Sequence, residues 1–182
     1  MVSRNFSRRD FLKITAGGVV LASTMPTVAW ASRPQEPRIL AMNNLNTGEL
    51  LESCYFNGKE YVDGELQKLN QFCRDHRRNE VHKMDKGLFD QLSQIQKLIG
   101  RESEVIVISG YRSPATNASL RKGSSRVAKK SLHMQGKAID FRLDGVKLST
   151  VRDAALSLKA GGVGYYPGSN FVHIDTGPVR SW

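Results

Sequence analysis

Apolar residues recur along this chain with two different periods, and each period predicts a different kind of element. From Arg38 to Phe56 the pattern fits a β-hairpin that turns at Asn46–Gly48. Two later stretches carry apolar residues three or four positions apart, which places them on one face of a helix. These stretches are Leu66, Leu69, Phe72 and Cys73 after Asp63, and Leu88, Leu92, Ile95 and Ile99 after Asp85 and before Gly100. We expect each aspartate to cap its helix.

The second half of the chain favours short strands. Val105–Ile108 is a continuous β-branched run, which suits a buried strand. Ser113 and Pro114 are typical of a helix start, and a further helix is expected over Ser149–Ala160. The remaining strands are expected at Lys137–Leu143, Gly162–Tyr166 and Phe171–Asp175. This order predicts a single α+β domain with a small, mostly antiparallel sheet and packed helices.

The first 31 residues have the pattern of an export signal. Ser7–Lys13, SRRDFLK, is similar to the twin-arginine motif, and Ala29–Ala31 offers a small-x-small cleavage pattern. Pro26 interrupts the apolar run between them, which is shorter than the ~20 residues that a membrane-spanning helix needs. We predict a removed signal over residues 1–31 and a periplasmic domain over residues 32–182 without a membrane anchor. An uncleaved anchor is the alternative.

The charge of the chain limits the kinds of partner that it could bind. The formal net charge of the 182 residues is +10, which indicates an anionic partner. Export argues against nucleic acid as this partner and leaves the carboxylate-rich polymer of the cell wall.

Cys54 and Cys73 could form a disulfide in an exported protein. Cys73 also suits a free thiol on an apolar helix face, so both states stay open.

One stretch carries the residues expected to do chemistry. Ser131–Asp140, SLHMQGKAID, places His133 and Asp140 seven positions apart, and His173 follows later in the chain. Two imidazoles and one carboxylate suit zinc, with a fourth position left for water. The alternative is a pair of structural histidines that hydrogen-bond the backbone.

Strand periodicity explains how these residues could converge. Asp140 lies opposite the apolar residues of its strand, and His173 and Asp175 lie opposite those of theirs. If both apolar faces cover one core and the strands are neighbours, the three side chains emerge on the same side of the sheet. Gly136 would let the preceding loop turn sharply enough to bring His133 back.

Three motifs together give a family resemblance. They are SGYRS at Ser109–Ser113, SLHMQGKAID, which fits S-x-H-x-x-G-x-A-x-D, and GGVGYYPGSNFVHIDTGP at Gly161–Pro178. The chain resembles the zinc-dependent D-alanyl-D-alanine peptidase family, whose fold is shared with the hedgehog signalling domain. The resemblance covers nearly all of Arg38–Trp182. Within the family it is closest to murein endopeptidases exported by the twin-arginine pathway.

The resemblance implies a role for each site residue. Zinc would be held by His133, Asp140 and His173, and Arg112 would hold substrate or the developing oxyanion. A structural salt bridge is the alternative for Arg112.

The motif leaves the general base open. Some members carry an acidic residue three positions before the last histidine, where this chain has Asn170, which cannot take a proton. Asp175 is the remaining carboxylate. It would act either as the general base or as a group that orients a metal ligand.

The predicted function follows from the resemblance. We expect a monomeric zinc peptidase that hydrolyses peptidoglycan cross-links during wall growth. The bond would join D-alanine to meso-diaminopimelate, or two meso-diaminopimelate residues. The alternatives are a D,D- or L,D-carboxypeptidase that trims stem peptides and a non-catalytic module that binds murein.

Overall fold

The computed structural model describes residues 35–124 and 127–182. The predicted export signal over residues 1–31 lies outside this part of the chain. The strands are β1 (Arg38–Asn44), β2 (Leu50–Phe56), β3 (Val105–Ser109), β4 (Ala138–Leu143), β5 (Gly162–Tyr166), β6 (Phe171–Asp175) and β7 (Arg180–Ser181). The helices are α1 (Asp63–Phe72), α2 (Lys86–Ile99), α3 (Pro114–Gly123) and α4 (Leu148–Leu158), with 3-10 helices η2 (Leu132–Gln135) and η3 (Pro167–Ser169). None of these helices has the length and apolar character needed to cross a bilayer.

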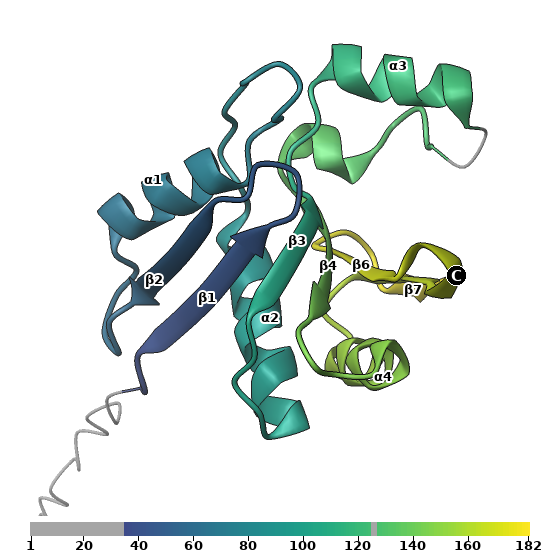
Figure 1. Cartoon of the computed structure of the whole chain (residues 1–182). Coiled ribbons are helices and arrows are strands. Elements are labelled where there is room, and N and C mark those ends of the chain that lie inside the picture. Colours follow the sequence, from purple (N-terminus) through teal and green to yellow (C-terminus); the bar gives the residue numbers. More distant parts are fainter. Residues whose placement is uncertain (1–34, 125–126) are drawn as a thin grey trace, which may run out of the picture. The chain divides into compact units, whose positions relative to one another are not determined.

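The strands form one mixed sheet of seven strands in the order β2-β1-β3-β4-β6-β5-β7 (Figure 1). Neighbouring strands are antiparallel except for the parallel pairs β1–β3 and β5–β7. The hairpin predicted over Arg38–Phe56 is the β1–β2 pair. The predicted α+β domain with a mostly antiparallel sheet is therefore confirmed.

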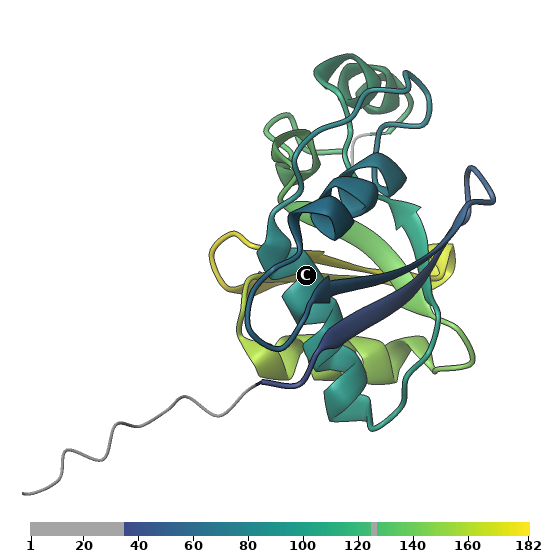
Figure 2. The same cartoon turned by 90° about the vertical axis from the view of Figure 1, so that its left-hand side faces the viewer.

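A single hydrophobic core lies against one face of this sheet. It contains alternate residues of the central strands, such as Ile139 and Phe141 on β4 and Val172 and Ile174 on β6. Helices α1, α2 and α4 contribute side chains to the same core, and α2 packs against both β1 and α4. Figure 2 shows α2 running behind the β1–β2 hairpin. The opposite face of β4 and β6 is therefore left for polar side chains.

The helix boundaries confirm the predicted caps at Asp85 and Ser113 and correct two other predictions. The Asp85 side chain accepts a hydrogen bond from the Gly87 amide, and α2 ends at Gly100 with φ of +70°. Asp63 does not cap α1, because it is the first helical residue and its carboxylate lies in the first turn. Acidic residues stabilise that position through the helix dipole instead. Helix α4 also stops earlier than predicted, at left-handed Lys159 rather than at the following glycines.

Both cysteines are free thiols. Cys73 is fully buried after α1, and burial raises the pKa of its thiol to about 12. Its carbonyl accepts a hydrogen bond of 2.8 Å from the Tyr111 amide. A Cβ atom on Gly110 would lie 2.9 Å from the Cβ atom of Cys73, which is closer than packed carbon atoms approach. Cys73 therefore packs directly against the SGYR segment and hydrogen-bonds it.

Gly136 makes the turn that leads from η2 into β4. Its φ is +65°, and an added Cβ atom would meet the Lys83 carbonyl oxygen and lie 2.9 Å from Cδ2 of His82. The Gly136 carbonyl accepts a hydrogen bond of 2.8 Å from the Asp85 amide. The sharp turn predicted here is present, and it packs against the segment that directly precedes α2.

Replacing Gly136 with alanine should destabilise the protein more than the same change at Gly100. Both residues are left-handed, which costs an L-residue roughly 1–2 kcal/mol. Only Gly136 also faces backbone at close range, because nothing lies within 4 Å of a Cβ atom at Gly100. We expect Gly136→Ala to lower the free energy of unfolding by at least about 3 kcal/mol in urea titrations. Equal losses in the two variants would contradict this account of the turn.

Candidate metal centre

The pairing of β4 with β6 brings Asp140 and His173 together. These two residues are direct partners in the antiparallel register. The flanking pairs Ile139–Ile174 and Phe141–Val172 point into the core, so Asp140 and His173 point to the other face. The condition set by the sequence analysis, that the two strands be neighbours, is met.

His133 reaches the same place from η2. Its ring is 1% exposed, and its Nδ1 atom lies 2.7 Å from the Gly110 carbonyl oxygen. The Arg112 amide donates a hydrogen bond of 3.2 Å to the His133 carbonyl. Two hydrogen bonds thus join η2 to the segment that follows β3, and they fix the imidazole against Asp140.

The three side chains have a spacing that suits a metal ion. Nε2 of His133 lies 3.3 Å from Oδ1 of Asp140 and 3.3 Å from Nδ1 of His173. The third separation, from Nδ1 of His173 to Oδ1 of Asp140, is 2.7 Å. Tetrahedral zinc with bonds of ~2.0–2.1 Å places its ligand atoms roughly 3.3–3.4 Å apart. Two of the three separations match that value, and the third is shorter.

The outer nitrogen of each imidazole has its own acceptor. Nδ1 of His133 is placed to donate to the Gly110 carbonyl, and Nε2 of His173 to donate to the Asp175 carboxylate at 3.1 Å. The inner nitrogens, Nε2 of His133 and Nδ1 of His173, then turn toward Asp140. Ligating histidines in metalloproteins are held in this way by a carbonyl or a carboxylate. The donor set of this group therefore fits a divalent metal.

The electrostatics of His133 and Asp140 favour the protonation states that a metal needs, whereas at His173 the carboxylates of Asp140 and Asp175 outweigh burial and raise the pKa. Burial lowers the pKa of His133, which keeps the imidazole neutral. Burial alone would raise the pKa of Asp140, but the two neighbouring imidazoles hold that pKa well below its usual range. Metal binding requires an ionised carboxylate and an unprotonated ring nitrogen. Asp140 and His133 thus approach the metal-binding state before any ion is added.

Asp175 contacts the outer nitrogen of His173, and its side chain is 0% exposed. It accepts hydrogen bonds from the amides of Gly162 at 3.0 Å and Gly177 at 2.8 Å. Arg180 adds two contacts, at 3.1 and 2.6 Å, and His173 faces the remaining side. Burial raises the pKa of Asp175, but these donors outweigh it and lower the pKa. Of the two predicted roles for Asp175, these contacts favour the orientation of His173.

Arg112 lies beside the metal group on the segment between β3 and α3. Its side chain is 14% exposed, and Nη2 lies 3.8 Å from Oδ2 of Asp140. Its Nε atom is buried without a hydrogen-bond partner among the described residues. Burial lowers the pKa of Arg112, although Asp140 acts in the opposite direction. The Arg112 guanidinium therefore retains hydrogen-bond donating capacity beside the metal group.

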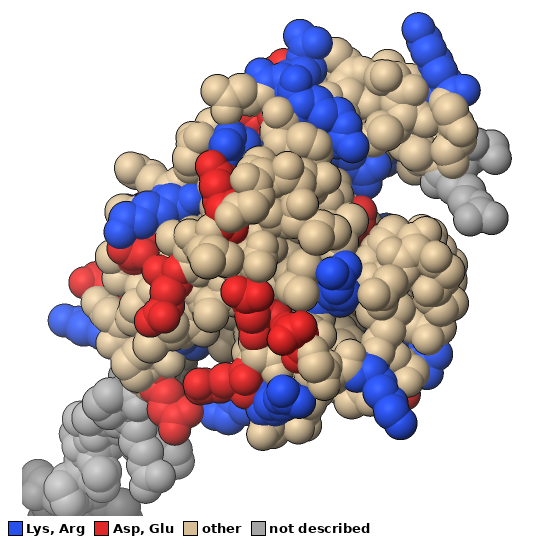
Figure 3. Space-filling view, in the orientation of Figure 1, with Lys and Arg blue, Asp and Glu red and all other residues tan. Residues whose placement is uncertain are grey.

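The site opens into a cleft of about 420 Å³ beside the metal group. Figure 3 shows the surface hollowed between the part that carries α3 and the part that carries β5 to β7. Tyr166, Phe171 and Trp182 line the far wall. The rings of Tyr166 and Phe171 stack at 4.6 Å, and the Trp182 indole nitrogen donates to the Tyr166 hydroxyl at 2.6 Å.

Sequence reasoning left several of these residues out or undecided. Arg180 and Trp182 lie on or beside β7, whose two residues are too few to show a period. Tyr166 lines the cleft, whereas Tyr165 packs against the core and under Arg152. Successive side chains of β5 point to opposite faces of the sheet. This alternation was the signal in the sequence that could have separated the two tyrosines. Asn170 ends η3 in a left-handed conformation and does not line the cleft.

Comparison with known proteins places the chain among the metallopeptidases of the M15 class. The profile of the family described as "Peptidoglycan L,D-endopeptidase MepK" matches residues 32–182. "Peptidoglycan L,D-endopeptidase MepK" of Escherichia coli (strain K12) is 54% identical over 179 residues, which cover 97% of each chain. "Probable peptidoglycan L,D-endopeptidase MepK" of Haemophilus influenzae is 50% identical over 180 residues, covering 97% of this chain and 95% of that one. The chain belongs to this family, which confirms the predicted family and enzyme class.

Changing Asp175 to asparagine should weaken metal binding. The neutral amide is a poorer acceptor for Nε2 of His173 and loses its ion pair with Arg180. Loss of such an outer partner costs about 10–100-fold in metal affinity. We expect that decrease for zinc in competition titrations with a chromophoric chelator. Asp153→Asn, which removes a carboxylate of α4 that pairs with Arg152, is the control and should leave the affinity unchanged.

The same variant separates the two roles of Asp175. If zinc affinity is unchanged in Asp175→Asn while hydrolysis is lost, the general-base role is the correct one. A fall in affinity that more zinc can compensate, with hydrolysis restored, supports the orienting role.

Proposed function

We propose that the protein is a zinc-dependent murein endopeptidase that hydrolyses peptide cross-links of peptidoglycan during wall growth. The convergence of His133, Asp140 and His173 beside Arg112 is the observation that carries this proposal. The relatives named as peptidoglycan L,D-endopeptidases supply the substrate class. An enzyme for a cross-linked polymer needs an open site, and this cleft is visible as a hollow in the surface (Figure 3).

The ligands would be Nε2 of His133, a carboxylate oxygen of Asp140 and Nδ1 of His173. Zinc in this position would act as a Lewis acid and would lower the pKa of water. Arg112 would donate hydrogen bonds to the oxyanion that develops on the scissile carbonyl, because its guanidinium has unpartnered donors. Asp175 would hold His173 in the tautomer that presents Nδ1.

The bond between two meso-diaminopimelate residues is the favoured target. The relatives' names specify an L,D bond. A cross-link between two meso-diaminopimelate residues runs from an L-centre to a D-centre, whereas a cross-link from D-alanine to meso-diaminopimelate joins two D-centres. Of the two predicted bonds, the one between two meso-diaminopimelate residues therefore agrees with the names of the relatives.

Export to the periplasm is part of this proposal. The family profile begins at residue 32, directly after the predicted cleavage site at Ala31. We propose that residues 1–31 form a removed twin-arginine signal and that residues 32–182 act on stem peptides in the periplasm. The mature chain is expected to be a monomer without a nucleic-acid partner or a membrane anchor.

Purified residues 32–182 incubated with intact murein test the proposal. With zinc, we expect cross-linked dimers to be converted to monomers, and a chelator should stop the conversion. Product masses identify the bond. Loss of terminal residues alone would indicate a carboxypeptidase, and no product from folded, zinc-loaded protein would indicate a binding module.

A ligand variant and a matched histidine variant make this test specific. His133→Gln removes a metal ligand and should lower hydrolysis by at least about 100-fold. His76→Gln changes a histidine that does not line the cleft and should retain activity. Similar rates in both variants would contradict the assignment of His133.

A further inference from the structure

A half-exposed tryptophan lies beside the candidate metal group. Trp182 is 50% exposed and lines the cleft that also holds His133, Asp140 and His173. The centroid of its indole lies 5.3 Å from that of the His173 ring, and the two rings are tilted by 51°. The indole therefore borders the position at which a substrate bound to this centre would present its scissile bond.

Backbone and side-chain contacts fix the position of this indole. The Trp182 amide donates a hydrogen bond of 3.2 Å to the Val163 carbonyl, and the Trp182 carbonyl accepts one of 3.1 Å from the Tyr165 amide. The indole nitrogen donates to the Tyr166 hydroxyl at 2.6 Å, and Cζ of Arg180 lies 5.0 Å from the indole centroid. Little side-chain entropy therefore remains to be lost when a ligand covers the ring.

Gly164 provides the space in which two aromatic rings pack. A Cβ atom at this position would lie 2.8 Å from Cε2 of Trp182 and 2.8 Å from Cε2 of Tyr166. Packed carbon atoms stay about 3.5–4.0 Å apart, so neither ring could keep its place against a side chain here. The Tyr166 ring also stacks on Phe171 at 4.6 Å. Tyr166, Phe171 and Trp182 thus form an aromatic wall that is held by close packing.

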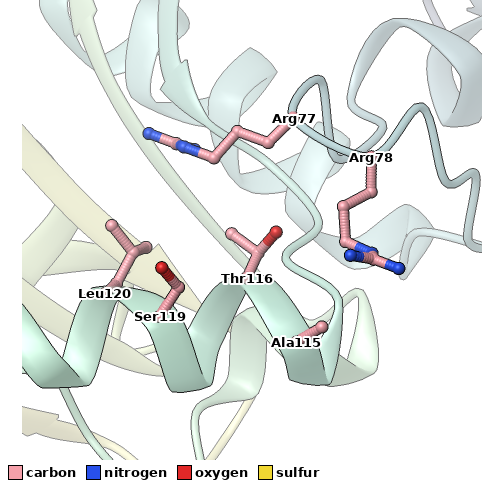
Figure 4. Close-up of a pocket in the computed structure, with 6 residues that line it drawn as sticks. All are labelled: Arg77, Arg78, Ala115, Thr116, Ser119 and Leu120. Atoms are coloured by element: carbon pink, nitrogen blue, oxygen red, sulfur yellow. The ribbon is translucent and has the colours of Figure 1, made fainter.

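A second cavity, of about 240 Å³, differs in character from the metal cleft. Figure 4 shows the side chains of Arg77 and Arg78 on one side of this cavity and side chains of α3 on the other. Among the described residues that line it, none is aromatic. Of these two cavities, the cleft beside the metal group is therefore the one that offers aromatic surface to a ligand.

The lining of the metal cleft indicates the chemistry of its ligand. Arg112 and Lys130 line it together with the aromatic wall, so charged and apolar groups of a ligand can both be accommodated. Diaminopimelate has both kinds of group, because a chain of methylene groups joins its two charged ends. The faces of aromatic rings carry partial negative charge, so they pack better against methylene groups than against a carboxylate. The aromatic wall therefore suits the methylene chain.

We propose that Trp182 is a specificity-determining residue whose exposed indole packs against the methylene chain of a diaminopimelate residue that flanks the scissile bond. The inference rests on the proposed function, which places diaminopimelate on both sides of that bond. D-alanine offers only a methyl group, which covers much less of the ring. Burial of the longer chain therefore favours cross-links between two diaminopimelate residues over those that begin at D-alanine.

Two pairs of dimer peptides test this role in the mature chain, residues 32–182. The peptides of a pair differ at one residue, norleucine or alanine, so that a butyl side chain is compared with a methyl side chain at equal charge. In the first pair this L-residue supplies the scissile carbonyl, and in the second pair a D-residue supplies the amine. Diaminopimelate stays on the other side of the bond. For at least one pair, we expect kcat/KM of the wild type to be about tenfold higher for norleucine.

Variants of Trp182 show whether the indole causes this preference. Trp182→Ala should reduce the tenfold preference to about twofold or less. A structural role alone, through the contact with His173, would lower kcat/KM equally for both peptides and leave the preference unchanged. Trp182→Phe keeps an apolar ring and should retain most of the preference. Leu98→Ala removes an apolar side chain that is 57% exposed on α2 and does not line the cleft, so this control should match wild type.

Fluorescence gives a readout that needs neither metal nor hydrolysis. Trp182 is the only tryptophan of residues 32–182, because Trp30 precedes them, so the emission of the mature chain reports on this indole alone. The protein is kept zinc-free with a chelator and titrated with each peptide. A norleucine peptide should shift the emission to shorter wavelength, since apolar groups replace water at the ring. Its alanine counterpart should bind about tenfold more weakly.

The outcomes separate this inference from the proposed function. A wild type without preference in either pair, or a preference that survives in Trp182→Ala, would overturn the role of Trp182. An emission shift with the murein disaccharide alone would assign the indole to the glycan and would overturn it too. If the wild type cleaves no peptide, the proposed function fails, and the titrations decide about Trp182. Unchanged emission with every peptide would then overturn the role, whereas a shift with about tenfold tighter binding of norleucine would support it.

Discussion

The register between β4 and β6 is the constraint on which the site depends. It places Asp140 opposite His173 on one face and the pairs Ile139–Ile174 and Phe141–Val172 on the other. A shift of one residue would turn the two polar side chains into the core and the apolar ones out of it. The hydrophobic free energy of the core thus also selects the arrangement of two candidate metal ligands. The third ligand has to be brought to this pair by a separate segment.

The support around the ligands explains why glycines and buried polar groups gather here. Gly136 turns η2 back onto the sheet at a point where no side chain would fit. Gly110 supplies a carbonyl to His133 and lies too close to Cys73 for a side chain of its own. Asp175 holds His173 from behind. The Gly110 carbonyl and the Asp175 carboxylate each fix an imidazole through its outer nitrogen and leave the inner nitrogen for a metal, which is how preorganised metal sites are built.

The sequence allowed a large part of this arrangement to be predicted, because the strand period already put Asp140 and His173 on a common face. The residue types already suited zinc, and the family motifs then favoured a metal site over a pair of structural histidines. The cap predicted at Asp63 was wrong, since spacing alone does not tell the residue before a helix from its first residue. The role of Asp175 could not be chosen from sequence, because its partners come from three separate positions. Trp182 was missed because it follows β7, a strand of two residues that is too short to show a period.

The most direct test of the account is a zinc-edge anomalous diffraction experiment on crystals of the zinc-loaded mature chain. The account predicts one zinc ion bound by Nε2 of His133, a carboxylate oxygen of Asp140 and Nδ1 of His173, with bonds of ~2.0–2.2 Å. It also predicts that Nε2 of His173 stays on the Asp175 carboxylate. Zinc at another position, or coordination through the opposite nitrogen of either imidazole, would contradict the central claim.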